Sequence, residues 1–210
     1  MSLPRMDAEA ISRRGVCLVL AAPSGAGKSS IARALLAAEP RLTLSVSVTT
    51  RSPRPGEAEG VAYFFRTQEE FRALADSGAL LEWATVFGRG YGSPRAPVEA
   101  ALDAGRDVLF DIDWQGFRQL RAALPGDVVG VFILPPSMAE LEARLRARGG
   151  DNEAEIALRM AAARREMSHA GEFDHLVVNR DFAVATAEVR AVLIAARTAT
   201  ARVRLPYPPD

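Results

Sequence analysis

The sequence predicts an α/β fold in which helices cover both faces of a parallel sheet, and three observations carry this prediction. Apolar stretches typical of buried strands alternate with stretches of helical periodicity. A phosphate-binding loop connects the first of these strands to the first helix. Between residues 42 and 93 the alternation is interrupted, which indicates a small mixed β/α lobe inserted into the core.

The core elements follow one another along the chain. Four apolar runs are typical of strands that are covered on both faces. They are residues 16–21, 107–112, 128–134 and 176–178. Five stretches have apolar residues at helical spacing. They are residues 29–38, 115–123, 138–146, 153–167 and 184–197.

The inserted lobe has its own pattern. Residues 42–48 alternate with period two, as a half-exposed strand does. A loop rich in Pro, Arg and Gly follows, and after it come a strand at residues 62–65, a helix at 69–75 and a strand at 80–86. A second insertion, residues 148–153, is Gly-rich and polar and joins two helices, so we expect a lid there.

These patterns divide the chain into parts. We expect a core of residues 15–41 and 94–197, a lobe of residues 42–93, and a lid at about residues 148–159. Residues 1–14 are expected to be a flexible N-terminus and residues 198–210 a tail, in which residues 202–210, with their Pro-Tyr-Pro-Pro, are expected to be loosely ordered.

The loop after the first strand matches the pattern G-x-x-x-x-G-K-[ST] except that alanine stands at its first position. Its residues are Ala22, Pro23, Ser24, Gly25, Ala26, Gly27, Lys28 and Ser29. An alanine is harmless there at negative φ, and Gly25 and Gly27 remain to supply unusual backbone angles. The alternative, a plain turn between a strand and a helix, explains neither the spacing nor the residues around it.

Lys28 is the only lysine among 26 lysines and arginines. An ammonium group is a compact point charge that fits a tight phosphate cradle, whereas the flat guanidinium fork does not. We therefore expect backbone N–H groups and Lys28 to bind the phosphates of a nucleoside triphosphate, with the Ser29 hydroxyl on Mg²⁺.

Composition excludes several other classes of function. The formal net charge is +0, so no overall field attracts nucleic acid or an anionic membrane. No run of 18 apolar residues could span a bilayer, and residues 1–14 lack the apolar core of a secretory signal. The one cysteine, Cys17, is expected to be a buried apolar residue. These features favour a cytoplasmic protein, and a homo-oligomer is compatible with them.

A second anion site is indicated inside the lobe. Arg51 and Arg54 lie three residues apart on a proline-stiffened loop, and Tyr63 and Tyr91 follow. Two guanidinium forks and two phenol hydroxyls suit a dianionic phosphate. The alternative is a solvated basic turn next to core tyrosines, and the residue types alone leave both interpretations open.

Two aspartates follow the second core strand. Asp111 ends a buried strand, where it could bind Mg²⁺ directly or through water. Asp113 lies two residues on, so in a strand both side chains would face the same side. An ordinary salt bridge at the end of a strand is the alternative for either residue.

Several blocks together resemble guanylate kinases. They are residues 45–57, 63–65, 81–84, 91–94, 111–116, 134–137, 144–149 and 177–179, and they follow the family's order and spacing from residue 15 to residue 197. The resemblance implies a P-loop kinase with a GMP-binding lobe, which transfers the γ-phosphoryl group of ATP to GMP, with Mg²⁺, to give ADP and GDP in purine nucleotide metabolism. Members of this family also carry Ala-Pro-Ser-Gly at the start of the loop.

The resemblance also implies roles for individual positions. Those that grip the GMP phosphate match Arg51, Arg54, Tyr63 and Tyr91, and those that read guanine match Ser47, Glu82 and Ser93, with Asp113 nearby. The lid arginines that act with Lys28 on the ATP phosphates match Arg144, Arg148 and Arg159. Asn179 matches a contact on the adenine side. Ser29 and Asp111 are the expected metal-binding residues.

One position departs from the family pattern. Val48 stands where known members have a polar residue, often His or Ser. If that side chain supports the GMP loop, its loss would weaken GMP binding modestly without removing a phosphate ligand.

Two other functions are open to this family's fold. A non-catalytic module would bind phosphoproteins through the GMP site, but it would have no need of Lys28 and Ser29. A kinase for another phosphorylated small molecule, such as a pentose phosphate, would have no need of Glu82 together with Ser47 and Ser93.

Overall fold

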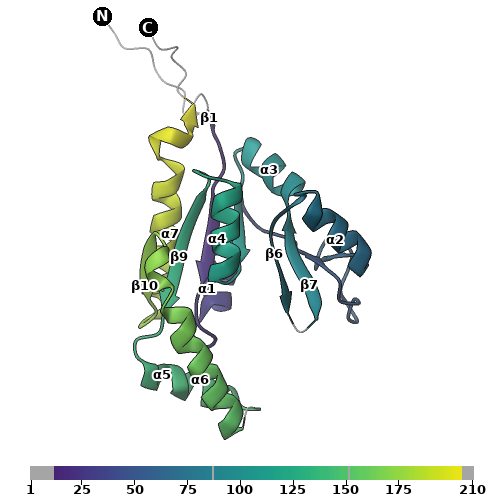
Figure 1. The fold of residues 1–210 in the computed structure, drawn as a ribbon. Coiled ribbons are helices and arrows are strands. Elements are labelled where there is room, and N and C mark those ends of the chain that lie inside the picture. Colours follow the sequence, from purple (N-terminus) through teal and green to yellow (C-terminus); the bar gives the residue numbers. More distant parts are fainter. Residues whose placement is uncertain (1–11, 87, 151, 205–210) are drawn as a thin grey trace, which may run out of the picture.

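A five-stranded parallel sheet forms the centre of the molecule in the computed structural model, which describes residues 12–86, 88–150 and 152–204 (Figure 1). The strand order is β10-β9-β2-β8-β3, and every neighbouring pair is parallel. The strands are β2 (Cys17–Ala21), β3 (Leu42–Leu44), β8 (Asp107–Asp111), β9 (Val128–Leu134) and β10 (His175–Val178). The predicted α/β class with a parallel sheet is confirmed.

Helices cover both faces of this sheet because its strands are apolar on both sides. Leu18 and Leu20 face a cluster formed with α1 (Lys28–Ala38) and α7 (Phe182–Arg197). Cys17 faces the opposite cluster, formed with α3 (Arg95–Asp103) and α4 (Trp114–Ala123). The predicted buried state of Cys17 is confirmed, and burial raises the pKa of its thiol to about 12.

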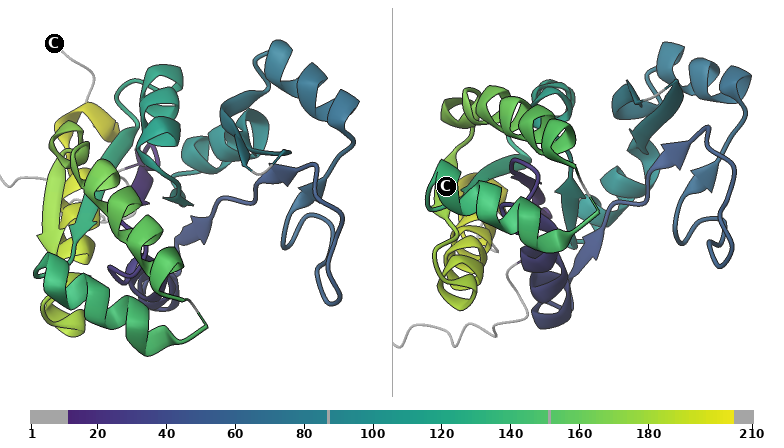
Figure 2. Two further views of the ribbon diagram at one scale, coloured as in Figure 1. Left: turned by 60° about the horizontal axis from the view of Figure 1, so that its bottom comes forward. Right: turned by 90° about the horizontal axis from the view of Figure 1, so that it is seen from below.

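The lobe stands to one side of the core (Figure 2). Its four-stranded sheet has the order β5-β4-β7-β6. The elements are β4 (Val48–Thr49), β5 (Phe64–Phe65), α2 (Gln68–Asp76), β6 (Leu80–Val86) and β7 (Arg89–Pro94). A capping box between Thr67 and Glu70 starts α2, and Phe71 buries the helix against the sheet.

The prediction of one strand at residues 42–48 was wrong. The run divides into β3, which is the edge strand of the core sheet, and β4, which belongs to the lobe. Its two ends are buried in different hydrophobic clusters, Leu42 in the core and Val48 in the lobe, so one straight strand cannot serve both. The core sheet therefore extends to Leu44, beyond the boundary expected at residue 42.

Between the lobe and the core, the sequence patterns missed the strand β7 and the helix α3. The strand β7 contains two glycines and a proline, which have low strand propensity. The glycines are needed because a Cβ on Gly90 would lie 2.8 Å from the Phe71 ring, and one on Gly92 would lie 2.9 Å from the Glu82 carbonyl oxygen. The helix α3 follows Pro94 directly and was hidden by Pro97 in its first turn.

Parts of the two terminal segments that were expected to be loosely ordered form regular structure. The short strand β1 (Ser12–Arg13) pairs antiparallel with β11 (Val203–Arg204), so the prediction was wrong for these residues. Charge explains the order, because Arg13 donates to the fully buried Asp107 at 2.7 and 2.9 Å. Residues 1–11 and 205–210, which were also expected to be loose, lie outside the described residues.

The region of the predicted lid contains two packed helices, α5 (Met138–Arg148) and α6 (Glu153–Met167), which project from the core (Figures 1 and 2). They share a small apolar cluster of their own, which includes Leu141, Leu145 and Ile156. Among the helices of the described residues, none has the length and apolarity that a membrane span requires.

Candidate functional site

The loop between β2 and α1 has the backbone that the phosphate-binding pattern predicts. Gly25 and Gly27 have φ of 97° and 101°, which only glycine adopts readily. A Cβ on Gly27 would also lie 2.3 Å from Asn179 Nδ2. In the part of the chain that the structure describes, no side chain caps α1, which begins at Lys28, so its N-terminal N–H groups are suited to an anion.

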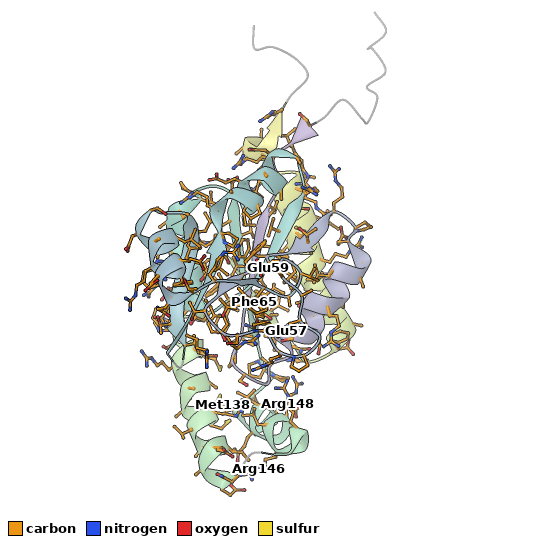
Figure 3. The ribbon with its side chains drawn as sticks, turned by 90° about the vertical axis from the view of Figure 1, so that its right-hand side faces the viewer. Glu57, Glu59, Phe65, Met138, Arg146 and Arg148 are labelled. Atoms are coloured by element: carbon orange, nitrogen blue, oxygen red, sulfur yellow. The ribbon has the colours of Figure 1, made fainter. Side chains whose placement is uncertain are left out.

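A hollow of about 300 Å³ lies over this loop. Its lining includes Ser24, Gly27, Lys28, Ser29, Arg148 and Glu166. The structure therefore brings Arg148 of α5 to the predicted triphosphate site, and Figure 3 shows Arg148 nearer the core than Arg146. Glu166 of α6 was missed in the sequence, because it belongs to none of the motifs described above.

The Lys28 ammonium forms an ion pair with the Asp111 carboxylate at the end of β8. Both side chains are partly exposed, at 23% and 34%. Asp111 thus supplies a negative charge beside the lysine of the loop. The salt bridge considered for Asp111 is present, and its role toward a metal remains a prediction.

Asp113 has a structural partner as well. It is the N-cap of α4, where one carboxylate oxygen accepts from Gln115 N and Gly116 N at 2.9 Å each. It also borders a small hollow next to Lys28. Asp113 therefore lies near the phosphate loop, and its place near guanine remains a prediction.

Of the other residues expected on the ATP side, Arg159 and Asn179 contact the loop directly, and Arg144 lies beside Asn179. The Arg159 guanidinium donates to Ser24 Oγ at 3.3 Å. Asn179 Nδ2 donates to the Ala26 carbonyl at 2.7 Å, so this side chain stabilises the loop itself. Arg144 is held by Glu140 at 2.9 Å and by the Asn179 carbonyl at 3.2 Å.

The residues expected to grip the second phosphate meet in the lobe. A hollow of about 510 Å³ is lined by Arg51, Arg54, Tyr63 and Tyr91, together with Val86 and Arg89. Arg89 was missed in the sequence, although a third arginine beside two glycines was a usable signal.

A carboxylate holds Arg51 in this hollow. Glu57 accepts from the Arg51 guanidinium at 2.8 Å and from Arg54 N at 2.7 Å. The Arg51 side-chain hydrogen bond lowers the pKa of Glu57, so the carboxylate is ionised and occupies the fork as an anion would. Figure 3 labels Glu57 with Glu59 and Phe65 in the same lobe.

Two of the three residues expected to read the base, Glu82 and Ser93, lie where β6 pairs with β7. Glu82 is only 7% exposed and accepts from Ser93 Oγ at 2.7 Å. Burial raises the pKa of Glu82, although the Ser93 hydrogen bond opposes this. Near the other oxygen, a Cβ on Gly116 would lie 3.1 Å away, so glycine leaves room beside it.

A further hollow of about 240 Å³ joins the two regions. Ser47, Tyr63 and Ser93 line it from the lobe side, and Asp111 lines it from the core. Glu82 borders it only through its partner Ser93. Because Asp111 also pairs with Lys28, this hollow leads from the predicted base-reading residues to the phosphate loop.

Val48 takes no part in these hollows. It is 3% exposed and packs with Phe71 and Leu80 in the apolar cluster of the lobe. Valine, which stands here in place of the polar residue expected from the family pattern, therefore has an apolar environment.

The central sheet is parallel, and a phosphate-binding loop follows its first strand. The lobe and the α5–α6 pair each carry arginines beside a hollow. These features together define a P-loop phosphotransferase. A family model described as guanylate kinase matches residues 14–196. The guanylate kinase of Gluconobacter oxydans is 66% identical over 92% of this chain and 93% of its own length. That of Granulibacter bethesdensis is 65% identical over 90% and 89%.

A solved structure agrees with these relatives. The crystal structure of guanylate kinase from Anaplasma phagocytophilum has a TM-score of 0.72 and 36% identity, with 92% of each chain covered. The chain belongs to the guanylate kinase family, and the resemblance stated from the sequence is confirmed.

Proposed function

We propose that this protein transfers the γ-phosphoryl group of ATP to GMP, and that the residues named above carry out the transfer. The observation that carries the proposal is the position of Asp111, which pairs with Lys28 at the phosphate loop and also lines the hollow of Ser47 and Ser93. A nucleoside triphosphate on the loop and guanosine monophosphate in the lobe would meet at this residue.

The reaction needs no general base, because the acceptor phosphate oxygen is already anionic near neutral pH. The barrier lies in bringing two polyanions together and in stabilising the charge on the migrating group. Lys28 supplies this charge once phosphate oxygens replace Asp111 as its partner. Arg148 and Arg159 add charge from α5 and α6, and Arg144 from a position beside Asn179.

Magnesium fits the oxygen donors at the loop. Ser29 lines the triphosphate hollow, and so does Lys28, whose ion-pair partner is the Asp111 carboxylate. Mg²⁺ is commonly held by one or two such groups plus substrate phosphates and water, and within the described residues no three metal-ligating side chains form a cage. When bound with ATP, the ion would neutralise phosphate charge; Ser29 and Asp111 would hold it.

On the acceptor side, we assign the phosphate to Arg51, Arg54, Tyr63 and Tyr91. An incoming phosphate would replace Glu57 on the Arg51 fork, so the arginine is already oriented for it. We assign guanine to Glu82 with Ser47 and Ser93, since an ionised carboxylate accepts from both donors, N1–H and the N2 amino group. Asp113 stays nearby as a cap.

The parts of the molecule have corresponding proposed roles. Residues 42–93 bind GMP, and residues at about 148–159 close over ATP as a lid. The reaction belongs in the cytoplasm, where ATP is available, and the partners are the two nucleotides. The family assignment disfavours a pentose phosphate kinase, and the intact loop disfavours a binding module.

Turnover with Mg²⁺ and ATP tests this function. GMP, AMP and ribose 5-phosphate are offered separately, and the ADP formed is measured. We expect ADP only with GMP. Equal ADP formation with ribose 5-phosphate would support the alternative kinase, and GMP binding without any ADP would support the non-catalytic module.

A further inference from the structure

Glu166 is a carboxylate in the triphosphate hollow that the reaction above does not use. It lies near the end of α6 and lines the hollow together with Lys28, Ser29 and Arg148. It also lines the small adjoining hollow beside Lys28 and Asp113. It is half-buried, and within the described residues its side chain makes no hydrogen bond or ion pair.

The end of α6 is fixed against the core. The His169 ring, three residues after Glu166, stacks on Trp114 of α4 at 3.6 Å between ring centroids. The Arg118 guanidinium lies 4.4 Å from the Trp114 ring centroid. Glu172 accepts from Arg118 at 2.6 Å and from His169 at 2.8 Å.

This contact stays intact at neutral pH, because the Arg118 hydrogen bond lowers the pKa of Glu172 to about 2. Glu166 is therefore set in place before any nucleotide arrives. Of the lid arginines, Arg148 at the end of α5 lines the same hollow as Glu166, and Arg159, two turns earlier on α6, donates to Ser24 Oγ of the loop.

A carboxylate fixed among phosphates raises an electrostatic problem. Two like charges in a partly desolvated hollow repel each other, and burial already raises the pKa of Glu166 while Lys28 opposes that shift. The position is favourable only if a donor or a cation stands between the carboxylate and the phosphates. Lys28 pairs with Asp111 in this structure and would turn to the phosphate oxygens when ATP binds, so it is not left over for Glu166. A hydrated Mg²⁺ fits better, because it keeps several of its waters and each can donate to a carboxylate.

We propose that Glu166 is a positioning residue that accepts hydrogen bonds from the waters of the nucleotide-bound Mg²⁺ and so makes the site selective for Mg²⁺–ATP over metal-free ATP. This rests on the proposed function, because it requires ATP on the loop. The enzyme would then bind metal-free ATP more weakly than Mg²⁺–ATP, even before GMP binds.

The test is calorimetric titration of ATP, without GMP, into the wild type and Glu166→Gln, once with excess Mg²⁺ and once with EDTA. The variant keeps the shape of the side chain and removes its charge. We expect Glu166→Gln to weaken Mg²⁺–ATP binding by about tenfold, the lower end for loss of an outer-shell partner. We expect it to tighten metal-free ATP binding by a few fold, because a repulsive charge is gone.

The opposite signs separate this role from a structural one, which would weaken both forms together. Glu188→Gln on the exposed face of α7 is the matched control and should change neither affinity. GMP affinity and the melting temperature check that Glu166→Gln folds.

Equal affinities of wild type and Glu166→Gln for both forms, or changes of the same sign, would overturn the role of Glu166 and leave the proposed function standing. Absence of ATP binding by the wild type in either condition would instead overturn the proposed function, and this inference with it.

Discussion

At the scale of single residues, the ion pair between Lys28 and Asp111 marks the point where both nucleotides would meet. Lys28→Ala removes the charge that balances the migrating phosphoryl group, so we expect turnover to fall by about 100–1000-fold. The melting temperature should change little, because this pair is partly exposed and such pairs contribute little to stability.

Lys28→Arg is the matched variant, since it keeps the charge but not the compact shape. It should also lose most of its turnover. Retention of more than about a tenth of the wild-type activity by Lys28→Ala would mean that the loop does not act on the phosphates.

Glu82 predicts a pH dependence for GMP binding. Burial raises its pKa above that of an ordinary glutamate, so as the pH falls it takes up a proton earlier than an exposed carboxyl would. The protonated form cannot accept from both guanine donors. GMP affinity should therefore be full above the raised pKa and should be lost as the pH falls through it.

The measurement is the GMP dissociation constant between about pH 8 and pH 5 for wild type and Glu82→Gln. Both proteins share the protonation of the GMP phosphate, so the difference between their curves reports Glu82. Parallel curves would show that Glu82 does not accept from the base.

The sequence predicted some of these side chains better than others. The glycines of the loop follow from its pattern, because a fixed backbone shape requires them. The hold of Glu57 on Arg51 could not be predicted, because it depends on how an exposed loop folds back. Glu166 was missed for a similar reason, since only the tertiary fold brings α6 to the loop.

At the scale of elements, the strongest apolar runs were predicted well. The bounds of β9 and α6 were predicted to the residue, because each element keeps one pattern of apolar residues along its whole length. The split of residues 42–48 was not predictable from alternation, because both halves share one pattern while packing in separate clusters. The strand β7 was missed because packing against Phe71 overrides its low propensity.

The α5–α6 pair is expected to depend on its own small cluster. Leu145 is 1% exposed within it, so Leu145→Ala should lower the free energy of opening of this pair by about 2–5 kcal/mol. Hydrogen exchange of the α5 and α6 amides measures this directly. Leu158→Ala is the control, because that leucine is 71% exposed on α6 and its loss should change almost nothing. Equal effects of the two variants would mean that the cluster does not hold the pair together.

At the scale of the whole molecule, the lobe and the α5–α6 pair lie on different sides of the phosphate loop (Figure 2). Each carries arginines that gain phosphate partners if the two parts approach the core, so ATP and GMP together should make the protein more compact. Small-angle scattering with both nucleotides, with each alone and with neither measures this. An unchanged radius of gyration with both bound would contradict closure.

The same closure predicts how Arg148 acts. Arg148 lines the triphosphate hollow and not the hollow of the lobe. Arg148→Ala should therefore lower kcat by at least about tenfold while the GMP dissociation constant stays nearly unchanged. A larger loss of GMP affinity than of kcat would mean that Arg148 acts on GMP and not on ATP.

We propose above all that the buried Glu82 carboxylate in the lobe recognises guanine for a phosphoryl transfer at the loop. The most direct test is kcat/KM for GMP, IMP and AMP with wild type and Glu82→Ala. Guanine offers two adjacent donors to Glu82, whereas adenine offers a lone pair and a C–H, so the site should reject AMP by about 10⁴–10⁵. IMP, which keeps N1–H but lacks the amino group, should fall between.

Glu82→Ala should lower kcat/KM for GMP by at least about tenfold, as loss of a charge-assisted hydrogen bond does, and should narrow the gap between GMP and AMP. If the wild type used AMP within about tenfold of GMP, or if Glu82→Ala kept the full discrimination, the account of substrate recognition would be contradicted.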